Sequence, residues 1–373
     1  MKRLVTVMVA ATTLLVGCGT KNTIVPVKFG KHWGYIEKTT GAYVINPQFD
    51  DAYGFAKNGL ARVEVGDKFG YIDKKGQYVI NPQFDYAGDF ADDGLARVLM
   101  DDKIGYIDKT GKYVINPQFE LAYDFAENSL ATFKMNDKYG YIDKTGKYAI
   151  NPQFDNAYRF ADNGLAIVEQ KGKCGYIDKT GKFVINPQFD KAYTFAKNGL
   201  ALVVQKDQYG YIDRTGNFAI NPQFDKAYNF VDIGLAVVKQ GDKYGYIDKT
   251  GKFVINPQFD RAYEFQKNGL AVVKQKDKCG YIDKTGNFVI NPQFDGAGDF
   301  SNNDLAQIVL RGKWGYIDKI GKCVINPQFD KGEMFDDCGL AIVKQGGKYG
   351  IIDKTGKFVV NPQFDDIEHL EDR

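Results

Sequence analysis

Short apolar runs separated by short polar segments fill almost the whole chain, and residues 234–265 show the pattern well. Residues 235–238 (Leu-Ala-Val-Val), 244–247 (Tyr-Gly-Tyr-Ile) and 253–255 (Phe-Val-Ile) are rich in β-branched and aromatic residues, which is typical of strands. Each run is shorter than an ordinary helix. The pattern therefore predicts three short antiparallel strands.

The segments between these runs have the composition of turns. Residues 240–243 (Gln-Gly-Asp-Lys) predict a tight turn, and residues 248–251 (Asp-Lys-Thr-Gly) fit a type I turn with aspartate first and glycine last. Asn256-Pro257 is expected to end the third strand, because proline cannot donate to a β-ladder. Residues 260–265 are then expected to turn the chain back.

Both faces of the predicted strands are apolar. Residues 235–238 and 253–255 lack the polar alternation of a sheet with one wet face. Such sheets need cover on both sides, and a neighbouring copy of the same unit is the simplest cover. The pattern predicts that the sheets stack on one another.

The unit repeats at a fixed period. The tetrapeptide Asn-Pro-Gln-Phe recurs every 35 residues, and its asparagines are Asn46, Asn81, Asn116, Asn151, Asn186, Asn221, Asn256, Asn291, Asn326 and Asn361. A glycine after an apolar residue recurs with the same period, apart from one first interval of 36, at Gly34, Gly70, Gly105, Gly140, Gly175, Gly210, Gly245, Gly280, Gly315 and Gly350. Residues 24–373 are therefore predicted to be an uninterrupted array of ten units.

These motifs resemble the bacterial WG-repeat (KWG-repeat) family. The resemblance rests on Trp33-Gly34-Tyr35-Ile36, Trp314-Gly315-Tyr316-Ile317 and the Asn-Pro-Gln-Phe motif, and it covers residues 24–370. The chain departs from the family at the tryptophan, which is replaced in eight units by Phe69, Ile104, Tyr139, Cys174, Tyr209, Tyr244, Cys279 and Tyr349. This range is typical of an apolar packing position, so the resemblance implies an architecture more than an activity.

The predicted fold class is all-β: a tandem array of ten units of 35 residues, each with three antiparallel strands. An open superhelical stack is favoured over a closed propeller, since propellers commonly have about four to eight blades. Closed propellers also often complete one blade with strands from both termini, and no unit of this chain looks split. In an open stack, removal of one unit should leave a shorter folded protein.

The first residues differ from the array. Met1-Lys2-Arg3 is followed by an apolar stretch, residues 4–16, that is too short to span a bilayer, and then by Leu15-Val16-Gly17-Cys18. This tetrapeptide resembles the lipobox of bacterial lipoproteins. It predicts a signal peptide at residues 1–18, fatty-acid (palmitate) attachment at Cys18, a short tether at residues 19–23, and contact with the bilayer. Gly19, in place of an aspartate, favours the outer membrane if the organism is Gram-negative.

Composition and charge exclude one class of protein and one class of partner. The chain is 44% hydrophobic and 26% charged, which excludes a disordered protein. The formal net charge of +2 is carried by Lys2 and Arg3, so the mature chain is formally neutral and nucleic acid is not expected as a partner.

Residues that could carry chemistry are few. The two histidines, His32 and His369, lie at opposite ends of the chain. A recurrent carboxylate, such as Asp248, is explained by its turn, and each unit brings only one, which is too few for a calcium site. Cys174 and Cys279 are expected as unpaired core residues. For Cys323 and Cys338, the sequence is compatible with a disulfide between them and with two free thiols. No catalytic residue, metal or cofactor is predicted, and the protein is not expected to be an enzyme.

Tyrosine recurs at one position in six units, after Asp-x-Ala in five of them and after Glu-x-Ala in the sixth, which makes this position, the tyrosine slot, the candidate binding site. Its members are Tyr53, Tyr123, Tyr158, Tyr193, Tyr228 and Tyr263, whereas the other units have Gly88, Gly298, Glu333 and Glu368 there. Tolerance of glycine and glutamate indicates an edge position, and we expect one row on the outside of the array. Packing between units is the alternative explanation. The leading function is an envelope-anchored binding or scaffolding surface for a protein or a glycan, and a passive spacer is the alternative.

Overall fold

The computed structural model describes residues 23–368, and all regular structure in this range is β-strand. The strands form ten antiparallel sheets of four strands each. We call each sheet a blade and number the blades along the chain. Blade 1 contains β40 and β1–β3, blade 2 contains β4–β7, and each following blade takes the next four strands up to β36–β39 in blade 10.

The four strands of a blade differ in length and position. The innermost strands are β40 (Asp366–Ile367), β4 (Asp51–Ala52), β8 (Tyr86–Ala87), β12 (Leu121–Ala122), β16 (Asn156–Ala157), β20 (Lys191–Phe195), β24 (Lys226–Ala227), β28 (Arg261–Ala262), β32 (Gly296–Phe300) and β36 (Lys331–Gly332). The second strands are β1 (Ile24–Phe29), β5 (Ala61–Val65), β9 (Ala96–Met100), β13 (Ala131–Met135), β17 (Ala166–Gln170), β21 (Ala201–Gln205), β25 (Ala236–Gln240), β29 (Ala271–Gln275), β33 (Ala306–Leu310) and β37 (Leu340–Gln345).

The two remaining strands of each blade contain the repeated glycine and the Asn-Pro-Gln-Phe motif. The third strands are β2 (His32–Glu37), β6 (Lys68–Ile72), β10 (Lys103–Ile107), β14 (Lys138–Ile142), β18 (Lys173–Ile177), β22 (Gln208–Ile212), β26 (Lys243–Ile247), β30 (Lys278–Ile282), β34 (Lys313–Ile317) and β38 (Lys348–Asp353). The outermost strands are β3 (Tyr43–Phe49), β7 (Tyr78–Phe84), β11 (Tyr113–Phe119), β15 (Tyr148–Phe154), β19 (Phe183–Phe189), β23 (Phe218–Phe224), β27 (Phe253–Phe259), β31 (Phe288–Phe294), β35 (Cys323–Phe329) and β39 (Phe358–Phe364).

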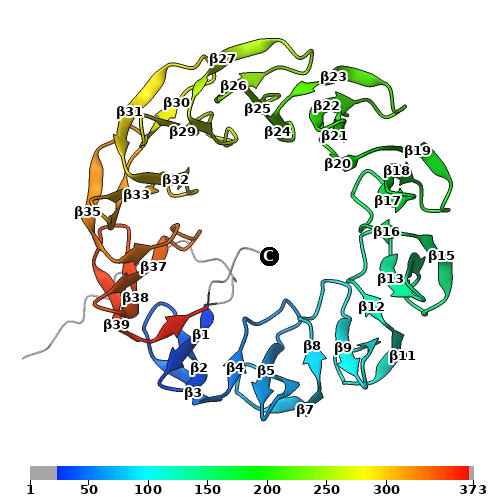
Figure 1. Ribbon diagram of the computed structural model, residues 1–373. Helices are drawn as coiled ribbons and strands as arrows, with labels where there is room; N and C mark the ends of the chain where they lie inside the picture. Colours follow the sequence, from blue (N-terminus) through cyan, green and yellow to red (C-terminus); the bar gives the residue numbers. More distant parts are fainter. Residues whose placement is uncertain (1–22, 369–373) are drawn as a thin grey trace, which may run out of the picture.

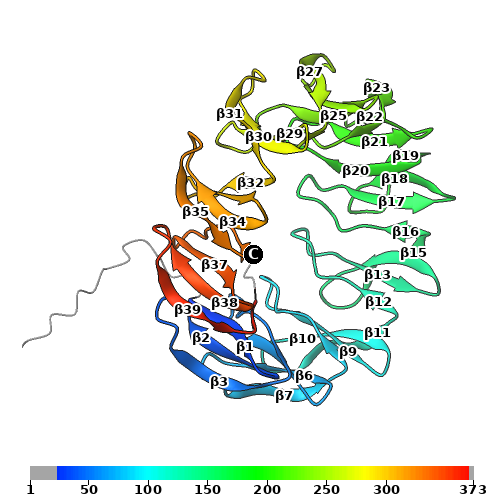
Figure 2. The ribbon, with the colours of Figure 1, turned by 60° about the vertical axis from the view of Figure 1, so that its left-hand side comes forward.

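The ten blades form a closed ring around a central hole, which is the architecture of a ten-bladed β-propeller (Figure 1). The short strands such as β4, β12 and β24 lie next to the hole, and the long strands such as β7, β15 and β27 lie on the perimeter (Figure 1). A view turned by 60° shows the same succession of blades, with β1 beside the last blade (Figure 2).

The ring closes by pairing the two ends of the array. In β40 and β1, Ile367 lies opposite Val27 and Asp366 lies opposite Lys28. Blade 1 therefore takes its innermost strand from the end of the chain and its other three strands from the beginning.

This closure corrects the open stack that the sequence favoured. The first unit has no Asp-x-Ala segment before its first strand, and the last unit has the equivalent segment Asp365-Asp366-Ile367, which no later unit uses. The composition of the segment predicts a turn, and a turn indicates neither a missing strand in the first unit nor a spare one in the last. The prediction of three strands per unit is wrong for the same reason, because each Asp-x-Ala segment forms a fourth strand.

The outermost strand also continues through the proline instead of ending there. In blade 3, β10 pairs with β11 with register shifts that place Ile104 opposite Phe119 and Tyr106 opposite Ile115. Asn116, Pro117 and Gln118 thus form a bulge, and proline is tolerated because this strand is the edge of the sheet.

The bulge explains why glycine recurs in the third strand. A Cβ atom added to Gly105 would lie 2.6 Å from the carbonyl oxygen of Ile115 and 2.7 Å from the nitrogen of Pro117. Equivalent distances of 2.5–2.8 Å occur at the corresponding glycine of every blade. Only glycine allows the third strand to approach the bulge this closely.

The core lies between blades, as the apolar faces of the strands predicted. One buried cluster combines Tyr246 and Phe259 of blade 7 with Phe265, Val273 and Ile282, which follow the chain into blade 8. The buried tyrosine of the third strand also links neighbouring blades, since the hydroxyl of Tyr246 donates to the carbonyl oxygen of Tyr263 at 2.8 Å. Blade 10 has Ile351 at this position, so its interface with blade 1 is purely apolar there.

Candidate ligand-binding site at the hole of the ring

The tyrosine slot directly follows the two-residue innermost strands and lies inside the longer β20 and β32, so it lies beside the hole and not on the outside as the sequence predicted (Figure 1). The backbone still follows the second strand there, because the amide of Tyr228 donates to the carbonyl oxygen of Val237 at 3.0 Å. In nine of the ten slot residues the carbonyl oxygen accepts a buried tyrosine hydroxyl, such as that of Tyr211 for Tyr228; the exception is Glu368, because the preceding blade has Ile351 in place of the tyrosine. The main chain of the slot is therefore structural, while its side chains differ from blade to blade.

Five of the six predicted tyrosines occupy consecutive blades. Tyr123, Tyr158, Tyr193, Tyr228 and Tyr263, in blades 4 to 8, keep 43%, 51%, 36%, 42% and 48% of their surface exposed. We call these five residues the tyrosine arc. Gly88 and Gly298 occupy the slot in the blades on either side. Partial burial raises the pKa of Tyr158, and smaller increases come from Cys174, Glu169, Tyr193 and Tyr123.

Tyr53, the sixth predicted tyrosine, is held by its neighbours. The guanidinium of Arg62 lies 3.6 Å from the centre of its ring, and its hydroxyl donates to Asp51 at 2.8 Å. Burial, followed by the hydrogen bond to Asp51, raises the pKa of Tyr53 to about 12. This ring is already covered, so we separate Tyr53 from the tyrosine arc.

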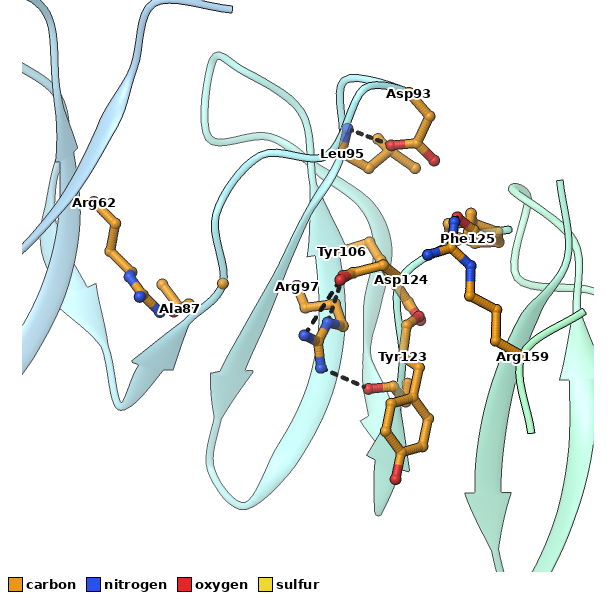
Figure 3. A network of polar contacts seen from close by, with 12 residues as sticks. Arg62, Ala87, Asp93, Leu95, Arg97, Tyr106, Tyr123, Asp124, Phe125 and Arg159 are labelled. Atoms are coloured by element: carbon orange, nitrogen blue, oxygen red, sulfur yellow. Dashed lines mark hydrogen bonds and ion pairs between the residues drawn. The ribbon is translucent and has the colours of Figure 1, made fainter. Parts of the chain in front are cut away.

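Arginines join blades 2 to 5 near the hole (Figure 3). Arg62 donates to the carbonyl oxygen of Ala87 in the next blade and lies 3.5 Å from Asp89. Arg97 donates to Asp124 at 2.6 Å, and Arg159 donates back to the carbonyl oxygen of Phe125 at 3.0 Å.

Figure 3 also shows that the ring of Tyr123 points away from this network. Sequence reasoning missed the arginines, although one signal was present. Arg62 and Arg97 occupy a position of the second strand that is apolar in blades 5 to 8, at Ile167, Leu202, Val237 and Val272.

In blades 8 and 9, which lie outside the arginine network, the residue after the tyrosine slot is a carboxylate. Glu264 and Asp299 belong to consecutive blades 8 and 9. Burial raises the pKa of both groups, and the charge of Glu264 further raises that of Asp299. Successive residues of an extended strand point to opposite faces. At the equivalent position of blade 4, Asp124 accepts a hydrogen bond from Arg97 of the preceding blade. By this geometry the carboxylates face the preceding blade, and the tyrosines face the following one.

The recurrent turn carboxylates are engaged within their own turns. Asp248 accepts hydrogen bonds from the amides of Thr250 at 2.8 Å and Lys252 at 3.1 Å, and the hydroxyl of Thr250 donates to it as well. The hydrogen bond from Thr250 lowers the pKa of Asp248. This capping role is the one that the turn composition predicted. Among residues 23–368, no group of three or more His, Cys, Asp or Glu side chains is arranged to hold a metal ion.

The remaining predicted residues are scattered. His32 lies 3.9 Å from Asp50 on the surface. Cys174 and Cys279 are free and buried, as predicted, and Cys323 is a free, exposed thiol. Cys18, the predicted signal peptide and His369 lie outside the described residues. Residues 23–368 contain no helix with the length and apolar character needed to cross a bilayer.

Comparison with protein families identifies the repeat. The profile described as WG containing repeat matches ten consecutive segments, at residues 33–69, 69–103, 104–139, 139–174, 175–209, 209–244, 244–279, 280–314, 314–349 and 349–372. No curated protein sequence matches the chain.

Several solved structures are similar to the chain at low sequence identity. A structure titled as the eukaryotic initiation factor is 12% identical, with a TM-score of 0.55 over 94% of this chain and 98% of that one. The extracellular domain of a putative hybrid two component system, BT4673 from B. thetaiotaomicron, is 10% identical, with a TM-score of 0.33 over 92% of this chain and 58% of that one. Hsv2p of Kluyveromyces lactis is 9% identical, with a TM-score of 0.37 over 62% and 92%.

Proposed function

The chain belongs to the WG containing repeat family, and from its ten-bladed ring we propose that it is a binding module of the bacterial envelope. In this proposal the tyrosine arc contacts a protein or glycan partner, and acylated Cys18 attaches the ring to the membrane, with the outer membrane favoured if the organism is Gram-negative. The proposed role is not catalytic, which is supported by the engagement of carboxylates such as Asp248 in their own turns.

The observation that carries the proposal is the exposure of five consecutive tyrosines at equivalent positions. Each retains between 36% and 51% of its surface, whereas the tyrosines of the third strands, such as Tyr246, are fully buried. Tyrosine supplies a large apolar face together with a hydroxyl, which suits contact with sugars and peptides. The slot also tolerates Gly88 and Gly298, so packing of the ring does not require the aromatic side chain.

A triple substitution of the arc tests the binding role. Tyr158→Ala/Tyr193→Ala/Tyr228→Ala keeps every carbonyl oxygen that accepts a buried tyrosine hydroxyl. We expect a cost of about 1–2 kcal/mol per site, compared with roughly 3–5 kcal/mol for a buried aromatic residue. Partner capture from solubilised envelope should be lost while the ring stays folded.

A matched control removes three tyrosines from the perimeter. Tyr43, Tyr78 and Tyr148 lie in outermost strands and are 43%, 44% and 37% exposed, close to the exposure of the arc. Tyr43→Ala/Tyr78→Ala/Tyr148→Ala should retain capture. Equal capture by both triple variants and the unaltered protein would refute the binding role and favour a passive spacer. Unfolding by the arc variant alone would show that those tyrosines are core residues.

The membrane attachment has its own test. Cys18→Ser should move the protein from the membrane fraction to the soluble fraction and abolish labelling with a fatty acid, because the sulfur atom that carries the acyl chain is removed. Unchanged fractionation together with unchanged labelling would refute lipidation at Cys18.

A further inference from the structure

Blades 6 to 8 place cations directly beside the tyrosine arc. The first residue of the innermost strand is Lys191 in blade 6, Lys226 in blade 7 and Arg261 in blade 8, and all three are exposed. Each lies two residues before an arc tyrosine, on the same face of the blade.

Contacts in other blades show that these two positions touch. Asn156 donates to the hydroxyl of Tyr158 at 3.4 Å in blade 5, and Lys331 pairs with Glu333 at 2.9 Å in blade 10. By the same geometry, Lys226 lies beside Tyr228 and Arg261 lies beside Tyr263.

The neighbouring strand adds further positive charge. Lys226 lies opposite Lys239 in the β-ladder, and Arg261 lies opposite Lys274. Like charges at directly opposed positions destabilise a sheet. Blade 2 has Asp51 opposite Glu64 at the same positions, and blade 10 has Lys331 opposite Lys344, where Lys331 pairs with Glu333. Blades 7 and 8 therefore differ from the others in combining an opposed pair of cations with an arc tyrosine.

Most of these cations have no carboxylate partner. Lys191, Lys226, Lys239 and Arg261 form no ion pair within residues 23–368, and Lys274 pairs at 3.3 Å with Asp277, whose side chain is 97% exposed. Each of the three inner-strand cations directly follows an aspartate (Asp190, Asp225 or Asp260), but these aspartates accept hydrogen bonds from Lys173, the amide of Gly241 and Lys243 instead.

From this arrangement we propose that the tyrosine arc of blades 6 to 8 binds an anionic polysaccharide. Lys191, Lys226, Lys239, Arg261 and Lys274, which we call the basic arc, would contact its acidic groups. The tyrosines would stack on the apolar faces of the sugar rings. One tyrosine and at least one cation recur in each of these blades, and this regular interval suits a polymer with repeated acidic sugars. An anion between two opposed cations also removes the repulsion of the empty pair.

The proposal rests on the proposed binding function and deepens it, and charge substitutions separate the two. Lys226→Gln/Lys239→Gln/Arg261→Gln removes three positive charges from the site and leaves every tyrosine in place. The control Lys179→Gln/Arg214→Gln/Lys249→Gln removes the same charge from exposed turn residues at the other end of the third strands.

Binding is measured by calorimetry with the full chain in detergent. The probes are polygalacturonate, alginate and heparin, with methyl-esterified polygalacturonate as the neutral counterpart of the first. We expect at least one acidic polymer to bind, with affinity that falls as salt is raised. The basic-arc variant should weaken this binding at least tenfold and the control variant less than twofold. The methyl ester should bind at least tenfold more weakly than the acid.

Three results would overturn the proposal. The first is no binding to any of the three acidic polymers, and the second is equal binding of polygalacturonate and its methyl ester. The third is equal or tighter binding of poly-glutamate, which would assign the surface to an acidic peptide. If the basic-arc variant still captures the envelope partner but the Tyr158, Tyr193 and Tyr228 variant does not, the binding function stands and the charge inference fails.

Discussion

Replacing Gly105 with alanine gives a sharp test of how the outer bulge shapes each blade. The new Cβ would lie 2.6 Å from the carbonyl oxygen of Ile115, 2.7 Å from the nitrogen of Pro117 and 3.0 Å from the carbonyl carbon of Asn116. All three atoms are backbone, so no flexible side chain can move aside. Gly105 is also outside the set of glycines with positive φ, and alanine therefore adds no backbone strain beyond this overlap.

The expected cost follows from the overlap. Overpacking a core usually costs about 1–3 kcal/mol, and rigid backbone neighbours place this site at the upper end, near 3 kcal/mol. For about 350 folded residues, an unfolding entropy of about 2.1 cal/mol/K per residue converts this cost into a Tm decrease of roughly 4 °C. Thermal unfolding of the full chain followed by circular dichroism measures the decrease.

Gly88→Ala is the matched control in the same blade. Gly88 also lacks a positive φ, and its added Cβ would have no neighbour closer than 3.7 Å. We expect a change within about 0.5 kcal/mol, or a slight stabilisation because alanine restricts the unfolded chain. Equal Tm values for Gly105→Ala and Gly88→Ala would refute the view that the bulge requires glycine.

Three further predictions follow from the ring. Deletion of residues 199–233 should lower stability and change the compactness measured by small-angle scattering, because nine blades can close a ring only if the angle between neighbouring blades changes. A compact product as stable as the parent protein would favour independent units. Arg97→Leu should lower the free energy of unfolding in urea by about 1 kcal/mol, because Arg97 donates to Asp124 at 2.6 Å and to the carbonyl oxygen of Ala122 at 3.1 Å from a partly exposed site. The double variant Arg97→Leu/Asp124→Leu should recover part of this loss. Equal stability of the single and the double variant would contradict a coupled pair. Hydrogen bonds from Lys138, Lys173 and Lys243 lower the pKa of Asp155, Asp190 and Asp260 below the ordinary value of 3.8. The stability that these ionised carboxylates contribute is therefore present above pH 3.8 and is lost as the pH falls through the lowered pKa. The urea midpoint should decrease mainly below about pH 4, and a constant midpoint from about pH 6 to pH 3 would contradict this role.

The repeat, the all-β class and the mutual burial of the sheets could be predicted because they depend on local composition and spacing. The period of 35 residues follows from the recurrence of Asn-Pro-Gln-Phe, and the Asp248 turn follows from the residues of the turn alone. The apolar faces of residues 235–238 correctly indicated that neighbouring units cover each sheet. These features do not depend on the tryptophan of the family motif, which is replaced in eight units.

The fourth strand and the closure could not be read from the same signals. A strand of two residues, such as Arg261–Ala262, is too short to show a period of apolar and polar positions. Such a strand forms only because the second strand has a free edge with which it can pair, and this pairing is a tertiary effect. Closure then depends on the twist summed over ten blades, which no single unit encodes. The site on the hole side was missed for this reason, although its tyrosines were identified.

Pairing between the first and last strands also affects how the protein is made. Synthesis proceeds from the N-terminus, and blades 2 to 10 can each complete their four strands as soon as a contiguous segment has emerged. Blade 1 cannot, because Val27 and Lys28 must wait for Ile367 and Asp366. Val25 and Val27, which are buried in the finished ring, therefore stay without their final cover for nearly the whole period of translation. The first blade to be made is the last to be completed.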